Sequence, residues 1–407
     1  MTQSDFIFPD EQTRPRRRGW LGKLLLSMVL IALLAIGALA AGLFYLNSQL
    51  KGSGIKVFST SGEEFEVPTA AEINGPINVL LIGSDTREDQ GANYGEAEGA
   101  RADVIILLHV SEDRQNAVAL SFPRDLMIPV PSCPNPDGSE PFPAADLKQI
   151  NATMQDGAHC TLIAVQALTG VEIPYLAVID FKGVIAMSEV VGGVTVCVAE
   201  PISDKYSKLY LDAGEHTLIG EQALAFLRTR HGVGDGSDLS RISNQQVFLT
   251  SLVRKLKDEG ALTNPFTMFT LATAALENMT LSQSLTNIGT ILGMAREVND
   301  VDLDRITFLK LPVYDMTGDY AGRVGLAEDQ ARVLFDKIAN DEALILQEAN
   351  VGTGAIVVEE KSETSLEAEP ETSDAPSSTP DPSETPTEEV LPEWVQGTTA
   401  STKTCSN

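Results

Sequence analysis

Three apolar stretches in the first third of the chain decide the fold: NVLLIGSDTR (residues 78–87), RADVIILLHV (101–110) and AVALSFPRD (117–125). Uninterrupted apolar runs of this length are typical of strands that are covered on both faces. Similar runs extend the prediction to strands at 77–82, 104–110, 117–122, 176–181, 194–198 and 306–311, with helices at 161–168, 183–190, 221–230, 241–257, 285–298 and 328–338. Strands interleaved with helices predict a single layered α/β/α domain around one mixed sheet.

Each of the three stretches carries an acidic and a basic residue at one end of its strand: Asp85 with Arg87, Arg101 with Asp103, and Arg124 with Asp125. Side-chain alternation places Arg101 and Asp103 on one face of their strand. A carboxylate beside a guanidinium can serve a metal ion and a phosphate together. One such pair is more often an ion pair at a surface turn. Three pairs at three strand ends indicate a binding site.

The second half of the chain adds further polar residues at the ends of predicted helices. Arg228 and Arg230 end one helical run, and Asp238, Arg241 and Gln245 begin the next. Arg241 and Gln245 are one helical turn apart and share a face, and Asp238 is positioned to cap that helix. Arginines near a helix end can be ordinary surface cations. Their concentration in an acidic chain favours a site for a polyanion, because the guanidinium holds phosphate oxygens bidentately.

Residues 24–46 are apolar or small almost throughout. A helix of that length extends roughly 35 Å, enough to cross a hydrocarbon core of about 30 Å. Basic residues within 14–23 predict a cytoplasmic segment 1–23, a single span, and an extracytoplasmic linker at 47–73. A cleaved signal peptide is the alternative, because Ala38-Leu39-Ala40 has the form of a cleavage site. Both readings put the domain outside the cytoplasm, and the first attaches it to the cell membrane.

The four cysteines of the chain agree with an exported location. We predict a disulfide between Cys133 and Cys160, the closest natural pair. Two alternatives stay open for Cys197 and Cys405: a second bridge that pins the end of the chain to the domain, or an unbridged, buried Cys197. Residues 359–407 are rich in Glu, Ser, Thr and Pro, which predicts a disordered tail after a domain at 74–358.

The net charge of −28 argues against a nucleic acid partner, because phosphates would be repelled. Zinc is also disfavoured. The sequence has no C-x-x-C motif, and its four histidines lack zinc-ligand spacing.

The motifs occur in an order that resembles one known family. In sequence they are GSDTR (83–87), RADVI (101–105), SFPRDL (121–126), KQIN (148–151), GGV (192–194), LDAGEHTLIGEQALAFLRTRH (211–231) and GDGSDLSRISNQQ (234–246). This series is similar to the LytR-CpsA-Psr family of cell-wall glycopolymer ligases. The resemblance implies a membrane-anchored α/β domain, a polyprenyl-pyrophosphate-linked glycan as donor, peptidoglycan as acceptor, and Mg²⁺ or Mn²⁺ at the pyrophosphate.

The resemblance also assigns roles to individual residues. It implies that Asp85 and Asp103 hold the metal ion and that Asp238 orients the arginines. The residues expected to bind pyrophosphate are Arg87, at the first strand end, and Arg101, Arg124, Lys148, Arg228, Arg230, Asp238, Arg241 and Gln245. Among them we expect Arg101, Arg124, Arg228 and Arg230 to act in catalysis together with Asp103.

The expected reaction is transfer of the glycan phosphate to a peptidoglycan hydroxyl, with polyprenyl phosphate as leaving group. Arginines and a metal ion would stabilise the charge on phosphorus, so no protein nucleophile is needed. Either Asp103 or Asp125 is the candidate base. The apolar helices at 161–168 and 183–190 are candidate walls of a lipid groove, with ordinary core as the alternative for each residue.

Two rival functions stay open at this point. A hydrolase would cleave the lipid pyrophosphate with the same residues and water as acceptor. A non-enzymatic polyprenyl-lipid binder or envelope regulator would need neither Asp85 nor Asp103, so the presence of both beside Arg101 argues against it.

Overall fold

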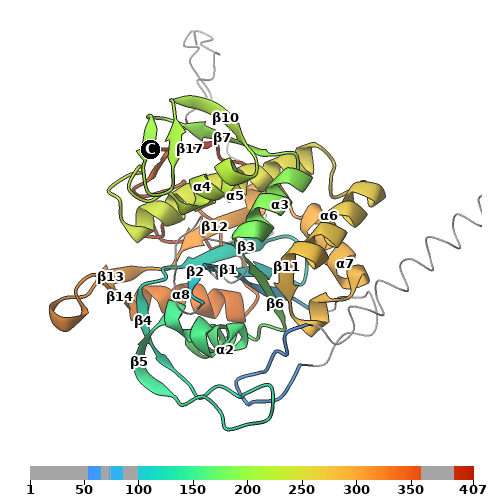
Figure 1. The fold of residues 1–407 in the computed structure, drawn as a ribbon, viewed down its shortest axis with the longest axis vertical. Coiled ribbons are helices and arrows are strands. Elements are labelled where there is room, and N and C mark those ends of the chain that lie inside the picture. The colour runs from blue at the N-terminus through green and yellow to red at the C-terminus, as the bar shows by residue number, and fades with distance from the viewer. Residues whose placement is uncertain (1–53, 66–72, 74, 86–99, 359–388) are drawn as a thin grey trace, which may run out of the picture. The chain divides into compact units, whose positions relative to one another are not determined.

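The computed structural model describes residues 54–65, 73, 75–85, 100–358 and 389–407 (Figure 1). The predicted span at 24–46, the segment 1–23, Arg87 and residues 359–388 lie outside the described residues. Among the described helices, none combines the length and the apolar character needed to cross a bilayer.

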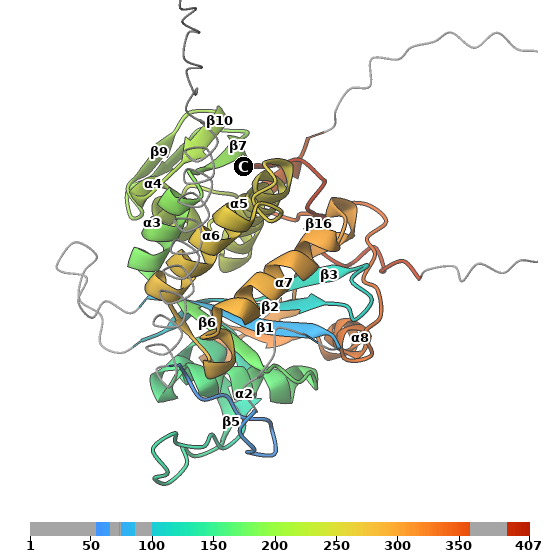
Figure 2. The ribbon, with the colours of Figure 1, turned by 90° about the vertical axis from the view of Figure 1, so that its right-hand side faces the viewer.

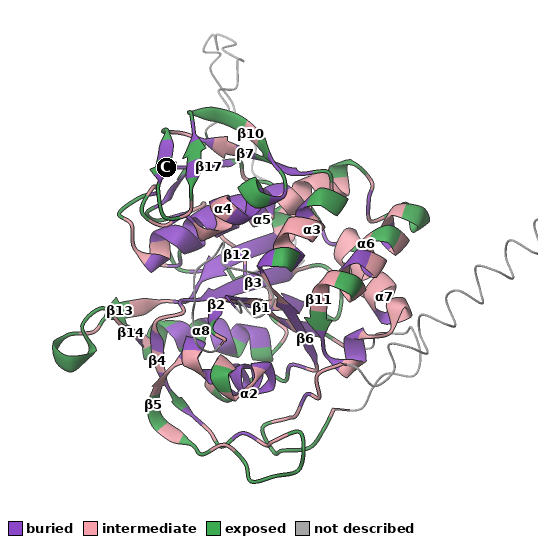
Figure 3. Ribbon diagram, in the orientation of Figure 1, coloured by how far each residue is buried: buried purple, intermediate pink, exposed green. Residues whose placement is uncertain are grey.

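A seven-stranded sheet forms the centre of the domain, in the order β11-β6-β1-β2-β3-β12-β16. β1 pairs in parallel with β6 and antiparallel with β2, so the sheet is mixed, as predicted. Its strands are β1 (Ile77–Ser84), β2 (Ala102–Val110), β3 (Ala117–Phe122), β6 (Tyr175–Ile179), β11 (Met279–Leu281), β12 (Ile306–Lys310) and β16 (Gly397–Thr399). Figure 3 shows the central strands largely buried, which accounts for their apolar runs.

Helices cover both faces of this sheet (Figure 2). On one face α2 (Ala158–Thr169) and α8 (Glu328–Ala339) pack into the main core. On the other lie α3 (Phe181–Val190), α4 (Glu221–Arg228), α5 (Asp238–Asp258), α6 (Pro265–Asn278) and α7 (Ile288–Asp300). The three-layer α/β/α prediction is therefore confirmed. The sequence reading missed α6, which Asn264 caps by accepting bonds from the backbone N–H groups of Phe266 and Thr267.

Smaller sheets surround the central one. One has the order β10-β7-β17-β15, with β7 (Val194–Val198), β10 (Gly214–Leu218), β15 (Ala355–Val357) and β17 (Thr404–Ser406). Another has the order β13-β14-β4-β5, with β4 (Leu126–Val130), β5 (Ala145–Gln149), β13 (Val313–Asp315) and β14 (Val324–Leu326); β8 (Ile202–Asp204) and β9 (Leu209–Leu211) form a hairpin. The prediction of one sheet is wrong for 194–198, because periodicity identifies a strand without its partners.

The prediction of a disordered tail is wrong for residues 389–407. β16 extends the central sheet beside β12, and β17 pairs in parallel with β7. Leu391 and Val395 are buried in the main core, although the surrounding composition is polar. A few apolar anchors are therefore enough to order a segment whose average composition predicts disorder.

Two disulfides join distant parts of the chain. Cys133 and Cys160 are bridged as predicted, with 5.5 Å between their Cα atoms. Cys197 and Cys405 form the second bridge, with a Cα separation of 4.5 Å. The open alternative for Cys197 is thereby resolved in favour of a bridge that holds β17 against β7.

Candidate functional site

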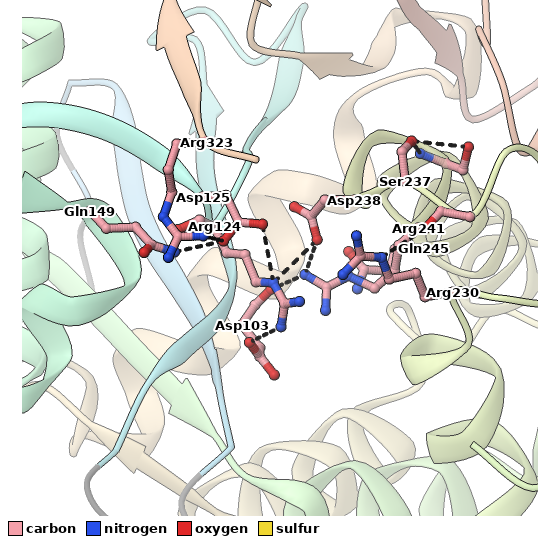
Figure 4. Close-up of polar contacts among 12 residues, drawn as sticks. Asp103, Arg124, Asp125, Gln149, Arg230, Ser237, Asp238, Arg241, Gln245 and Arg323 are labelled. Atoms are coloured by element: carbon pink, nitrogen blue, oxygen red, sulfur yellow. Dashed lines mark hydrogen bonds and ion pairs between the residues drawn. The ribbon is translucent and has the colours of Figure 1, made fainter. Parts of the chain in front are cut away.

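A cluster of carboxylates and guanidiniums lies where β2 begins and β3 ends (Figure 4). Arg124 Nη1 donates to Asp103 Oδ1 over 2.7 Å, and Arg124 Nε lies 3.4 Å from Asp238 Oδ1. Arg241 Nη2 lies 2.6 Å from the same Asp238 oxygen and 2.9 Å from the carbonyl oxygen of Asp103. One carboxylate thus holds two guanidiniums side by side.

The antiparallel pairing of β2 with β3 and the start of α5 create this cluster. Ile105 pairs with Phe122, so the residues just beyond this pair, Asp103 and Arg124, approach each other at the same edge. The Ser237 hydroxyl caps α5 by accepting from the Ser240 N–H. Asp238 was expected to be the cap, and this is wrong. It lies in the first helical turn, where its carboxylate is directed at Arg124 and Arg241.

Burial and charge act in opposite directions on the two guanidiniums. Burial tends to lower the pKa of Arg124, but the carboxylates of Asp103, Asp238 and Asp125 more than offset this and raise it. Burial dominates for Arg241, which is only 6% exposed, and lowers its pKa despite the nearby Asp238. Among the described residues the buried Nε of Arg241 has no hydrogen-bond acceptor, so an anion that accepts from it would be stabilised.

Arg228 and Arg230 approach the cluster from the end of α4. The Arg228 guanidinium lies over the Phe181 ring, 4.4 Å from its centroid. Arg230 Nε donates to the carbonyl oxygen of Gly236 over 2.7 Å, and Figure 4 shows this side chain beside Gln245 and Arg241. Gln245 in turn donates to the carbonyl oxygen of Leu227 over 3.1 Å.

Asp204, at the end of β8, fixes the segment that carries Arg230. Its Oδ2 accepts from the Thr229 hydroxyl over 2.8 Å and from the Arg230 N–H over 3.1 Å. Burial tends to raise the pKa of Asp204, but these hydrogen bonds bring it down to about 2. The sequence reading missed this residue, because a single Asp in a strand gives no signal of what it will bind.

Other predicted site residues take different positions. Lys148 pairs with Asp156, whereas its neighbour Gln149, missed from the sequence, donates to Asp125 Oδ1 over 2.6 Å. Arg101 is exposed before β2, and its N–H donates to Asp85 Oδ1 over 2.9 Å.

An apolar cavity of about 420 Å³ opens between the central sheet and its helices, next to the cluster. Leu81 and Ile106 line it from the sheet, and Leu271 and Leu292 line it from α6 and α7. Its polar lining includes Ser84, Asp103, Asp180, Ser188, Arg228, Arg241 and Gln245. The hollow is therefore apolar along most of its wall and charged at the cluster.

The two helices predicted as groove walls differ. α3 lines the cavity through Val184 and Met187. The segment 161–168 does not, because α2 packs solidly on the opposite face of the sheet, with Leu162 fully buried in the main core. For α2 the alternative of ordinary core is the one that holds, since apolar character alone does not distinguish core from cavity wall.

Of the two predicted metal ligands, Asp85 directly follows β1 and Asp103 lies in the neighbouring β2. Ser84 pairs with Ala102, which brings Asp85 and Asp103 to the same edge of the sheet. Asp85 is buried and Asp103 lines the cavity. Carboxylate oxygens are the ligands that Mg²⁺ and Mn²⁺ prefer, so this donor set fits the expected ion in kind. Among the residues that the structure describes, His159 also lies close to Cys133 and Cys160. These two cysteines are joined in a disulfide and therefore offer no thiolate to a metal ion.

Comparison with known proteins identifies relatives of this chain. The LytR_cpsA_psr family model matches residues 42–338. The cell wall biosynthesis protein LcpA of Corynebacterium glutamicum is 29% identical over 279 residues, covering 62% of this chain and 53% of that protein. The polyisoprenyl-teichoic acid–peptidoglycan teichoic acid transferase TagT of Bacillus subtilis is 29% identical over 186 residues, covering 44% of this chain and 52% of that protein. The chain thus spans about half the length of these curated relatives.

Solved structures share the fold. TagV of B. subtilis aligns with a TM-score of 0.51 at 20% identity, covering 66% of this chain and 99% of that one. A structure described as TagT bound to LI-WTA aligns with a TM-score of 0.50 at 21% identity, covering 71% and 97%. At this identity the likeness concerns the fold alone.

Proposed function

This chain belongs to the LytR-CpsA-Psr family, and on that premise we propose that it is a glycopolymer phosphotransferase of the cell envelope. It takes a glycopolymer from a polyprenyl-pyrophosphate carrier and links it by a phosphodiester to a peptidoglycan hydroxyl. The observation that carries the proposal is an apolar cavity that ends at Asp103, Arg228 and Arg241. The name of the related TagT, a teichoic acid–peptidoglycan transferase, supports the same reaction class.

The cavity suits the lipid part of such a donor. Its wall is apolar where it is formed by Leu81, Leu271 and Leu292, and its volume of about 420 Å³ lies within the usual range for ligand pockets. A polyprenyl chain bound there would bury its apolar surface between sheet and helices. Its phosphate end would then reach the arginines.

The arginines suit the pyrophosphate. Asp238 holds Arg124 and Arg241 together, so their positive charge is fixed in place before a ligand arrives. Preorganised donors of this kind stabilise the charge that develops on phosphoryl oxygens, without reorganisation during the reaction. Arg228, stacked on Phe181, adds a third guanidinium and lines the cavity together with Arg241.

Asp85 and Asp103 would hold the divalent cation, Mg²⁺ or Mn²⁺. When bound, the ion would neutralise part of the pyrophosphate charge. Asp103 is also the better candidate to accept the proton of the attacking hydroxyl. It lies at the arginine cluster, where the phosphate would be held, whereas Asp125 accepts from Gln149 and lies near Arg323.

Glycan transfer from a synthetic lipid-pyrophosphate donor to peptidoglycan fragments tests the proposal. Asp103→Ala and chelation of the metal should each lower transfer on the order of a hundredfold, and Arg228→Lys should do so through loss of the guanidinium fork. Asp315→Ala, at an exposed position in β13, is the matched control and should transfer normally.

Three outcomes would contradict the proposal in different ways. Transfer that survives both the chelator and Asp103→Ala excludes the metal-assisted mechanism. Release of the glycan phosphate to water, with no peptidoglycan product, identifies a hydrolase. Donor binding without turnover identifies a lipid-binding regulator.

A further inference from the structure

A second hollow, of about 560 Å³, lies between the β8–β9 hairpin and α4. Two tyrosines line it, Tyr206 and Tyr210, and they are 66% and 65% exposed. Lys208, Glu221 and Gln222 supply polar atoms around the same space. We call this hollow the hairpin pocket.

The hairpin pocket shares a wall with the apolar cavity. Leu224 and Arg228 line both. Arg228, one of the arginines at the proposed phosphate site, therefore stands at the boundary between the two spaces. A ligand in the hairpin pocket would lie beside a phosphate held by Arg228.

The same carboxylate fixes the hairpin and the arginine segment. Asp204 Oδ1 accepts from the Tyr206 N–H over 2.8 Å, while its Oδ2 accepts from the Arg230 N–H over 3.1 Å. The Tyr206 ring also packs on His231, with 4.7 Å between ring centroids. The pocket is therefore held in a fixed relation to the arginines instead of being carried on an independent loop.

The pocket lining has the chemistry that recognises a sugar ring. An aromatic side chain presents an apolar plate to the C–H face of a sugar, and side-chain amide, carboxylate and ammonium groups bond its hydroxyls. Gln222, Glu221 and Lys208 supply these groups next to Tyr210. The mixture of both charge signs fits a neutral polyhydroxy ring better than a polyanion or a lipid.

We propose that the hairpin pocket is a subsite for a sugar ring of the acceptor glycan. This inference rests on the proposed function. Displacement at phosphorus requires the attacking and leaving oxygens to lie in line on opposite sides. If the leaving lipid occupies the apolar cavity on one side of Arg228, the attacking hydroxyl approaches from the other side, which the hairpin pocket borders.

The test compares two exposed tyrosines in the full-length protein. Tyr210→Ala removes the proposed sugar contact, and Tyr320→Ala, 43% exposed and away from the pocket lining, is the matched control. With soluble peptidoglycan glycan-strand fragments as acceptor, Tyr210→Ala should raise the acceptor KM about tenfold. The donor KM and kcat at saturating acceptor should stay unchanged, and Tyr320→Ala should behave as the unsubstituted protein.

Equal acceptor KM values for the two variants would overturn the subsite. A rise in the donor KM in place of the acceptor KM would also overturn it, by assigning the pocket to the donor glycan. If the unsubstituted protein transfers nothing, the proposed function fails separately. Calorimetric binding of the same fragments then decides the subsite: binding that Tyr210→Ala weakens supports it, and binding that is absent or insensitive to Tyr210→Ala overturns it.

Discussion

The two faces of the central sheet are both covered by helices but are packed differently. On the solid face, formed with α2 and α8, ten of the twelve residues of α2 are buried. On the hollow face, formed with α3, α5, α6 and α7, only Thr290 of the thirteen residues of α7 is buried, although Ile291, Leu292 and Met294 are apolar. Ile291 and Leu292 border the cavity instead of filling it, whereas Met294 packs against a cluster of buried residues from the sheet.

Apolar character marks two separate things in this chain. Filled core stabilises the fold, whereas an unfilled apolar cavity costs stability that better packing would recover. A protein that keeps such a cavity beside fixed charges retains it for a ligand, which is how we interpret the hollow face.

The largest expected effect concerns the disulfide on the side of the hollow face. Cys197–Cys405 holds β17, whose Ser406 hydroxyl donates to Asn244 on α5. It closes a loop with a sequence separation of 208, against 27 for Cys133–Cys160 on the solid face. Loop entropy predicts losses of about 5 and about 3.5 kcal/mol when each pair is replaced by serine. Urea unfolding of the two double variants measures this, and a larger loss for the Cys133–Cys160 pair would contradict it.

The next largest difference in stability should come from shortening one leucine on each face. Leu162→Ala on α2 removes a fully buried side chain from a filled core and should lower the free energy of unfolding by about 3 kcal/mol. Leu292→Ala, at the cavity wall, should cost less than about 1 kcal/mol, because its side chain already borders empty space. Chemical denaturation compares the two, and equal losses would mean that the hollow face is packed like the solid one.

Sequence patterns predicted the bounds of helices and strands more reliably than the elements against which they pack. Strands 117–122 and 194–198 have the predicted bounds, yet β7 lies outside the central sheet. Periodicity reports which side chains are buried but not which partner buries them. For the same reason, both α2 and α3 were candidate groove walls and only α3 became one.

The candidate site was partly predictable. Asp103, Arg124, Asp238 and Arg241 meet as their strand-end and helix-end positions indicated. Asp204 was not predictable, because its role depends on a hairpin folding back over α4. Lys148 was expected at the site but forms an ion pair with Asp156. A lysine within a motif can therefore pair with a carboxylate that the motif does not include.

Two buried lysines, one on each face of the sheet, should make the stability of the fold respond to pH in opposite directions. Lys310, on β12, bonds to Ser243 of α5, and burial lowers its pKa to about 8. Lys337, on α8, gains a hydrogen bond from its ammonium group to Glu389, which raises its pKa.

Linkage fixes the sign of each effect. Between pH 8 and about 10.4 the unfolded chain retains the proton that folded Lys310 has lost, so this lysine makes stability rise with pH by about 3 kcal/mol. The contribution of Lys337 is fully present below its unfolded pKa and is lost as pH rises through its higher folded value. Stability measured against pH for Lys310→Met and Lys337→Met checks both signs. If Lys310→Met leaves the slope between pH 8 and 10.4 unchanged, the assignment is wrong.

The smallest expected effect on stability is also the sharpest test of the comparison, because it fills space instead of removing it. Ala164, on α2, is fully buried, and Ala164→Phe should overpack the solid face and cost about 2 kcal/mol. Ala295, on α7, lines the cavity, so Ala295→Phe should place its ring in the hollow with almost no change in stability. The same ring should lower the affinity for a polyprenyl phosphate at least about tenfold by occupying its space. Thermal unfolding and binding of a short-chain polyprenyl phosphate, measured on both variants, separate the two outcomes. A large loss of stability in Ala295→Phe would mean that the hollow face is not empty. An unchanged lipid affinity would mean that the hollow face is not the site of the lipid.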